Sequence, residues 1–181
     1  MNIFMVHSDP VIAAQSLVDR HCVKMILESA QLLSTAHRLL DGEEYIGQSK
    51  SGRKAKRWRL DDQREPIVYS ATHINHPSSV WARTSIQNYM WLVEHMFGLM
   101  AEYTYRYDKV HSIQKSNLGY LLQSPPMNLR EFDQTVMPCA MDIKYQISDD
   151  PVENYRCYYK QAKKHLHTWT KRNAPEWMNA D

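Results

Sequence analysis

The feature that most constrains the fold is a long segment, residues 11–41, that contains no glycine and no proline. Asp9 and Pro10 precede it, and a carboxylate N-cap followed by proline at the first helical position is a typical helix start. Gly42 follows it and supplies a natural end. Apolar or small residues recur at helical spacing along it: Val18, Cys22, Met25, Ser29, Leu32, Ala36 and Leu40. The segment therefore predicts one long amphipathic helix.

Three further helices are predicted over residues 76–110, 112–123 and 151–172, with boundaries set by proline and N-cap signals. Asn75 or His76 is expected near the cap of the first of them. The first six residues predict a short strand or an extended arm, and residues 41–72 predict a long polar, basic loop or insertion. The expected fold class is mainly α: a compact single-domain helical fold over residues 1–181, with a short N-terminal arm and a long basic loop.

Composition excludes several classes of protein. The 181 residues are 43% hydrophobic and 23% charged, which is typical of a globular chain. No apolar run approaches the roughly 20 residues needed to cross a bilayer, so no membrane partner is expected. The start MNIFMVHSDP does not resemble a signal peptide. Three cysteines without CxxC spacing (Cys22, Cys139 and Cys157) are expected to be reduced thiols, which favours a cytoplasmic protein.

The first candidate site is a stripe of His21, Lys24 and Glu28 on the long helix. Seven residues advance a helix by about 700°, about 20° short of two turns, so His21 and Glu28 project along nearly the same line. Glu28 beside cations could stabilise a positive sugar transition state or shuttle a proton, and His21 could orient Glu28 or hold a phosphate. The alternative is a solvated helix face with one ion pair.

The stretch VDRHCVKMILES, residues 18–29, resembles the active-site helix of the bacteriophage pyrimidine-dimer DNA glycosylases of the endonuclease V type. That family has an Asp-x-His and a catalytic Glu seven residues after the His, which correspond here to Asp19, His21 and Glu28. The resemblance implies a DNA glycosylase that uses no metal and no organic cofactor. The whole chain also resembles a group of uncharacterised small phage proteins, which would place it in the host cell cytoplasm.

One departure from the family concerns the N-terminus. The family attacks the sugar with the amine of a threonine that is exposed when Met1 is removed, and the amine forms an imine. Here the second residue is Asn2, whose larger side chain disfavours removal of Met1. The strand-cutting lyase step therefore loses its mechanism. A glycosylase that hydrolyses with an activated water, or a binding protein without catalysis, would tolerate the change.

Cations concentrate in a chain whose formal net charge is only +2. The run KSGRKAKRWR, residues 50–59, surrounds Trp58 with Lys50, Arg53, Lys54, Lys56, Arg57 and Arg59. This pattern suits contacts to a phosphate backbone and stacking on a base, although charge runs are often only solvated. A second basic cluster lies at residues 160–172. It could also contact nucleic acid, or its cations could interact favourably with the C-terminus of a helix.

The stretch THINHPSSVWAR, residues 72–83, holds the remaining candidates. His73 and His76 could cap a helix, bind a phosphate together with Arg83, or form part of a metal site, for which two histidines are a weak signal. Farther along, Trp91 shares a helix face with Asn88 and His95. It could stack on an extruded base, although a core tryptophan is the commoner outcome.

The favoured interpretation is a glycosylase-like protein that acts on damaged or modified pyrimidine nucleotides, with duplex DNA as its partner and a displaced nucleotide at Glu28. The DNA would be held by Arg20, Lys24, residues 50–59 and Arg83. Two alternatives remain open: a phage DNA-binding or host-interaction protein without catalysis, and an enzyme acting on small nucleotides. Duplex affinity that falls steeply with salt would favour the two DNA interpretations over the small-nucleotide enzyme.

Overall fold

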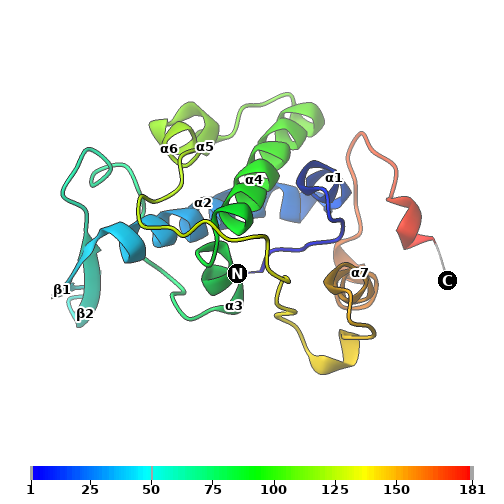
Figure 1. Ribbon diagram of the computed structural model, residues 1–181. Coiled ribbons are helices and arrows are strands. Elements are labelled where there is room, and N and C mark those ends of the chain that lie inside the picture. The colour runs from blue at the N-terminus through cyan, green and yellow to red at the C-terminus, as the bar shows by residue number, and fades with distance from the viewer. Residues whose placement is uncertain (1, 50, 180–181) are drawn as a thin grey trace.

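A computed structural model describes residues 2–49 and 51–179 and confirms the mainly α fold class. Its elements are α1 (Pro10–Ser16), α2 (Asp19–Asp41), β1 (Glu43–Gln48), β2 (Lys54–Arg59), α3 (Pro77–Ala82), α4 (Ile86–Tyr107), α5 (Ser112–Lys115), α6 (Asn117–Leu121) and α7 (Pro151–Ala162) (Figure 1). Short 3-10 turns occupy Ile143–Tyr145, Lys164–Leu166 and Glu176–Met178. No helix in the described part of the chain is long and apolar enough to cross a membrane.

The long N-terminal helix is interrupted, which corrects the prediction of one continuous helix. The Asp9 side chain caps α1 as expected, but Leu17 and Val18 have extended backbone and separate α1 from α2. The Val18 N–H donates to the Tyr159 hydroxyl at 3.0 Å, and both Leu17 and Val18 are fully buried. This partner lies far away in the sequence, so local helix signals could not predict the break. The end of α2 at Gly42 agrees with the prediction.

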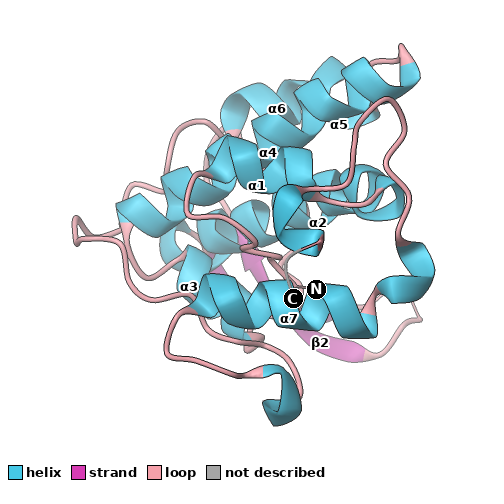
Figure 2. Ribbon diagram, turned by 90° about the vertical axis from the view of Figure 1, so that its right-hand side faces the viewer, coloured by secondary structure: helices cyan, strands magenta, loops and turns pink. Residues whose placement is uncertain are grey.

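Helices α2 and α4 form the centre of the molecule, and α1 packs against α4 (Figures 1 and 2). Gly98 makes this approach close, because a Cβ there would lie 3.0 Å from the Ala14 Cβ and 3.3 Å from the Val11 Cα. The helix predicted over residues 76–110 is also interrupted, since Ser85 accepts a hydrogen bond from the Asn88 N–H and starts α4 separately from α3.

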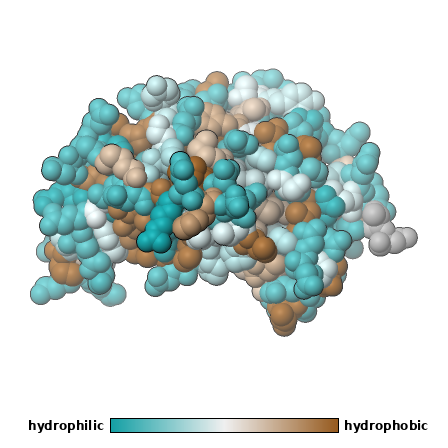
Figure 3. Space-filling model, viewed as in Figure 1, coloured by the Kyte–Doolittle hydropathy of each residue, from teal (hydrophilic) through white to brown (hydrophobic). Residues whose placement is uncertain are grey.

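Strands β1 and β2 pair as an antiparallel hairpin, which corrects the prediction that all of residues 41–72 form a loop or insertion. Glu44 pairs with Trp58, and Tyr45 pairs with Arg57. Gly52 in the turn has φ +77°, which suits glycine. Successive side chains of these strands point to opposite faces of the ribbon. Because many of them are charged, the sequence does not show the apolar–polar alternation that usually predicts a strand. In Figure 3 the end of the molecule over β1 and β2 is mostly hydrophilic.

Residues 60–70 are ordered by one buried arginine. Arg38 on α2 has only 5% of its surface exposed and donates to the carbonyl oxygens of Trp58, Glu65, Val68 and Tyr69. It also pairs with the Glu65 carboxylate. A guanidinium satisfied by this many acceptors can be buried without a large penalty.

The remaining elements differ from prediction mainly in length. The helix predicted over residues 112–123 is divided into α5 and α6 at Ser116, and the last helix ends at Ala162 rather than near residue 172. The N-terminal residues form an extended arm without a strand, and residues 3–6 are buried. Arg156 on α7 donates to the Val6 carbonyl, which fixes the arm against that helix.

Candidate functional site

Glu28 lies near the middle of α2, and its side chain is only 12% exposed. Lys24, one turn earlier, places its Nζ 2.9 Å from Glu28 Oε1, and the lysine side chain is 63% exposed. Arg20 and Leu27 are exposed on the same helix. The predicted stripe therefore presents a shielded carboxylate at the border of a hydrated, cationic helix face.

His21 has a different environment from Glu28, although both lie on the same stripe. Its ring stacks on Phe4 of the N-terminal arm, with centroids 4.4 Å apart, and its Nδ1 is 2.8 Å from the Tyr159 hydroxyl on α7. Burial lowers the pKa of His21 to about 4, helped by the nearby charges of Lys163 and Lys24. A neutral, buried ring is a poor phosphate ligand. The structure therefore corrects that part of the prediction and gives His21 a packing role between α2, the arm and α7.

Asp19, the other member of the Asp-x-His motif, also fastens distant segments to α2. Its carboxylate accepts hydrogen bonds from the Thr170 N–H at 2.9 Å and the Thr170 hydroxyl at 2.7 Å. It also pairs with Arg106 of α4 at 2.9 Å. Asp19 and His21 together hold the C-terminal third of the chain against the first half of α2. Among the three motif residues, Glu28 is the one directed to the exposed cationic face.

The segment before α3 lies beside α2. The Thr35 hydroxyl donates to the Thr72 carbonyl at 3.2 Å and accepts from the Thr72 N–H at 3.1 Å. His76 caps α3, since its Nδ1 accepts from the Ser78 N–H at 3.2 Å, which confirms the capping interpretation. His73 is exposed, has φ +50°, and pairs through Nδ1 with the Thr72 hydroxyl.

Glu28 and His73 each lie near enough to His76 for their charges to act on its imidazole. Burial lowers the pKa of His76; the charge of His73 adds to this effect, and Glu28 opposes it. Arg83 stabilises the same segment by donating to the Ile74 carbonyl at 2.8 Å and to the Ser79 hydroxyl at 3.0 Å, and burial lowers its pKa. The structure thus brings together residues that the sequence placed in two separate candidate sites.

The hairpin carries the basic run that was predicted to bind DNA. Lys56 pairs with Glu44 at 2.8 Å and Arg59 with Glu43 at 3.8 Å, so part of its charge is neutralised within the ribbon. Arg57 donates to the Gln48 carbonyl, and Trp58 is half-buried. Arg53 and Lys54, next to the turn, are exposed. Lys50 of this run and Met1, whose removal the imine mechanism requires, lie outside the described residues.

Trp91 is a core residue, the commoner of the two outcomes considered for it, and not the base-stacking residue that was the alternative. Only 6% of its surface is exposed. Its indole N–H donates to the Ser8 carbonyl at 2.7 Å, and its ring stacks on His95 with centroids 5.1 Å apart. A base could not reach this ring without unfolding the contact between α4 and the start of α1.

Two further observations complete the description of the site. Within residues 2–49 and 51–179, no group of three His, Cys, Asp or Glu residues is arranged to hold a metal ion. A cleft of about 930 Å³ lies beside His37 and not at Glu28. Because nine residues advance a helix by about 900°, Glu28 and His37 project from opposite sides of α2. The lining of this cleft comes from segments far apart in the chain, so the cleft could not be predicted from the sequence.

Comparison of the chain with protein-family models, with curated proteins and with solved structures found no match.

Proposed function

We propose that this protein is a DNA N-glycosylase that acts on a damaged or modified pyrimidine nucleotide displaced from duplex DNA. The observation that carries the proposal is the position of Glu28: a carboxylate with a 12% exposed side chain, paired with Lys24 and close enough to His76 for its charge to act on that imidazole. The resemblance of residues 18–29 to the glycosylase active-site helix supports the same assignment.

The chemistry follows from where charge develops. As the bond between the sugar carbon C1′ and the base nitrogen breaks, positive charge builds on the sugar and negative charge on the base. A carboxylate beside C1′ stabilises the sugar cation and can accept a proton from the attacking water. The hydroxide portion of that water bonds to C1′, and the departing base takes up a proton. Glu28 is proposed for this role.

The cations around Glu28 suit the DNA backbone. Arg20 and Lys24 extend from the exposed side of α2, and His73 is exposed at the start of α3. The hairpin adds Arg53 and Lys54 near its turn. Most of the affinity of a protein for duplex DNA comes from such contacts to phosphates. In this proposal the backbone flanking the displaced nucleotide lies along α2, and the hairpin contacts the duplex farther away.

The proposed reaction is hydrolysis without an imine. The Asn2 side chain donates to the Ala140 carbonyl at 3.0 Å and accepts from the Tyr155 hydroxyl at 2.8 Å. These two contacts fix the second residue between the arm, α7 and the segment before it. They favour a structural use of Asn2 in place of the threonine that supplies the amine in the glycosylase family.

The experiment is to incubate the wild-type protein with ultraviolet-irradiated duplex DNA, with duplexes carrying modified pyrimidines, and with the corresponding free nucleotides. The proposal predicts release of a free base, or of a base held only by the dimer bond, from at least one duplex. It also predicts duplex affinity that falls steeply with salt. Tight duplex binding without base release would instead indicate a binding protein. Turnover of free nucleotides without duplex binding would indicate a small-nucleotide enzyme, and either result would overturn the proposal.

A further inference from the structure

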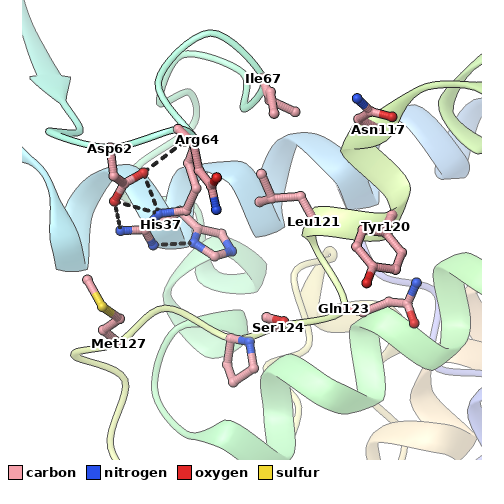
Figure 4. A pocket seen from close by; sticks show the side chains of 12 residues that line it. His37, Asp62, Arg64, Ile67, Asn117, Tyr120, Leu121, Gln123, Ser124 and Met127 are labelled. Atoms are coloured by element: carbon pink, nitrogen blue, oxygen red, sulfur yellow. Dashed lines mark hydrogen bonds and ion pairs between the residues drawn. The ribbon is translucent and has the colours of Figure 1, made fainter.

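The cleft on the other side of α2 has the size of a ligand site. Its volume is about 930 Å³, within the upper part of the range of small-molecule pockets. One side is formed by residues 62–67, which follow β2, and the other by α6 and residues 123–127 (Figure 4). None of the residues proposed to act with Glu28 lines it.

The floor of the cleft is a hydrogen-bonded chain with a defined direction. Arg64 donates to His37 Nδ1 at 3.0 Å, and His37 Nε2 lies 3.0 Å from the Tyr89 hydroxyl. That hydroxyl donates to the Leu122 carbonyl at 2.9 Å, so it accepts from the Nε2 proton of His37. Burial lowers the pKa of His37 to about 4, and the charge of Arg64 adds to the effect. A neutral histidine, hydrogen-bonded at both ring nitrogens, therefore lies at the floor of the cleft.

The charge of the floor argues against an anionic ligand. The Arg64 guanidinium is paired with both Asp41 and Asp62. Two carboxylates around one guanidinium leave this part of the cleft with no spare positive charge. A phosphate group placed there would meet the Asp62 carboxylate and would find most of the arginine donors already used.

The opposite wall offers a flat aromatic surface and amides. The Tyr120 residue is 81% exposed and lies in Figure 4 beside Leu121, across the cleft from Arg64 and His37. Asn117 and Gln123 are exposed at the same side and carry an amide donor and acceptor each. An exposed ring, an aliphatic neighbour and two amides are suited to a planar molecule with its own amide-like edge.

We propose that this cleft binds a neutral nitrogen heterocycle, namely a nucleobase or a nucleoside without phosphate. The base stacks on Tyr120, its polar edge pairs with the amides of Asn117 and Gln123, and the lack of spare positive charge at the floor excludes the phosphorylated forms. This site does not depend on the chemistry of Glu28 and is separated from it by the width of α2.

The test is a titration of the full-length protein with cytidine, thymidine and adenosine, followed by NMR chemical shifts. The matching 5′-monophosphates and free ribose are titrated in parallel. The proposal predicts saturable binding of at least one nucleoside with a Kd in the micromolar to millimolar range, and binding at least about 10-fold weaker for its monophosphate and for ribose. Absence of saturation by all three nucleosides, or equal or tighter binding of the monophosphate or of ribose, would overturn it.

A pair of variants locates the site. Because Tyr120 is mostly exposed, Tyr120→Ala should leave the fold intact and weaken nucleoside binding by about 10-fold, which corresponds to the loss of one stacking contact. The control is Phe132→Ala, which removes an aromatic residue that is 57% exposed and lies outside the cleft lining. Glu28→Gln should not change the affinity for the nucleoside. Equal affinities of the Tyr120→Ala and wild-type proteins would contradict the assignment.

Discussion

Neighbouring residues on α2 have separate tasks. Asp19 contacts Thr170 and Arg106, and His21 contacts the Tyr159 hydroxyl. These contacts hold the C-terminal part of the chain in place. Glu28 is two turns farther along the helix than His21 and pairs with Lys24 at the border of the exposed face. The spacing of His21 and Glu28 could be read from the sequence. The partner of His21 could not, because Tyr159 is brought to it by folding.

The hydroxyl of Tyr159 is predicted to be important for stability. It accepts from the Val18 N–H at 3.0 Å and pairs with His21 Nδ1 at 2.8 Å, and the residue is fully buried. Tyr159→Phe leaves two buried polar groups without this partner and should lower the free energy of unfolding by about 1–3 kcal/mol. Urea denaturation measures this difference. The matched control is Tyr158→Phe at the neighbouring, less buried tyrosine; an equal loss in both variants would contradict the explanation.

At the scale of elements, helix existence was predictable and helix continuity was not. The cap at Asp9, the end at Gly42 and the Asp150–Pro151 start are local signals and agree with the structure. The break at Leu17–Val18 depends on a tertiary contact with Tyr159, whereas the break before Ser85 is accompanied by a local cap that the prediction overlooked. The hairpin was not predicted because charged residues occur on both faces of its strands, so no clear alternation of apolar and polar residues appears in the sequence. Its register, in which Glu43 lies opposite Arg59, is known only from the structure.

The contact between α1 and α4 gives a sharp test of packing. Gly98→Val would force a branched side chain toward the Ala14 Cβ and the Val11 backbone, which a Cβ would already approach to 3.0 and 3.3 Å. The variant should lose about 1–3 kcal/mol of stability in thermal or urea unfolding. Ala101→Val, at an exposed position of the same helix, carries only the helix-propensity cost of less than about 0.7 kcal/mol. Similar losses at both positions would argue against close packing at Gly98.

The hairpin is tested through the salt dependence of DNA binding. Replacing Arg53 and Lys54 together by serine should reduce the slope of log K against log salt by about 0.9 for each phosphate contact removed. The control replaces Lys109 and Lys115, two exposed cations beyond α4, in the same way. An unchanged slope in the hairpin variant, or the same change in the control, would exclude the hairpin from the interface.

At the scale of the whole molecule, one hydrophobic core joins the N-terminal arm, α1, α2, α4 and α7. Three histidines lie in or beside it: His21, His37 and His95, each at most 7% exposed. This arrangement could not be predicted from a sequence in which histidines first suggest ligands. The candidate carboxylate and the His76 cap were identified from the sequence, whereas the cleft on the other side of α2 depends on how distant segments meet.

The buried histidines predict loss of stability in mild acid. Burial lowers the pKa of each of them to about 4 from the ordinary value of 6.5. Between these values the unfolded chain binds protons that the folded protein does not. The free energy of unfolding should therefore fall, by up to about 1.4 kcal/mol per pH unit for each histidine, as the pH decreases from 6.5 towards 4. Urea denaturation across this range measures the slope, and imidazole NMR titration identifies the residues. A free energy that stays constant over this range would contradict the assignment.

The role of Glu28 is tested most directly by the rate of base release by Glu28→Gln under single-turnover conditions. The substrate is the duplex from which the wild-type protein releases a base fastest. The substitution keeps the size of the side chain and removes its charge. The rate of Glu28→Gln should be at least about 100-fold lower, since a positioned carboxylate contributes about 10²–10⁴-fold. The affinity of Glu28→Gln for the duplex should stay close to that of the wild-type protein. The control variant Glu94→Gln, at an exposed glutamate of α4, should release the base at close to the wild-type rate. Equal release rates for Glu28→Gln and the wild-type protein would contradict the central claim that Glu28 performs the chemistry.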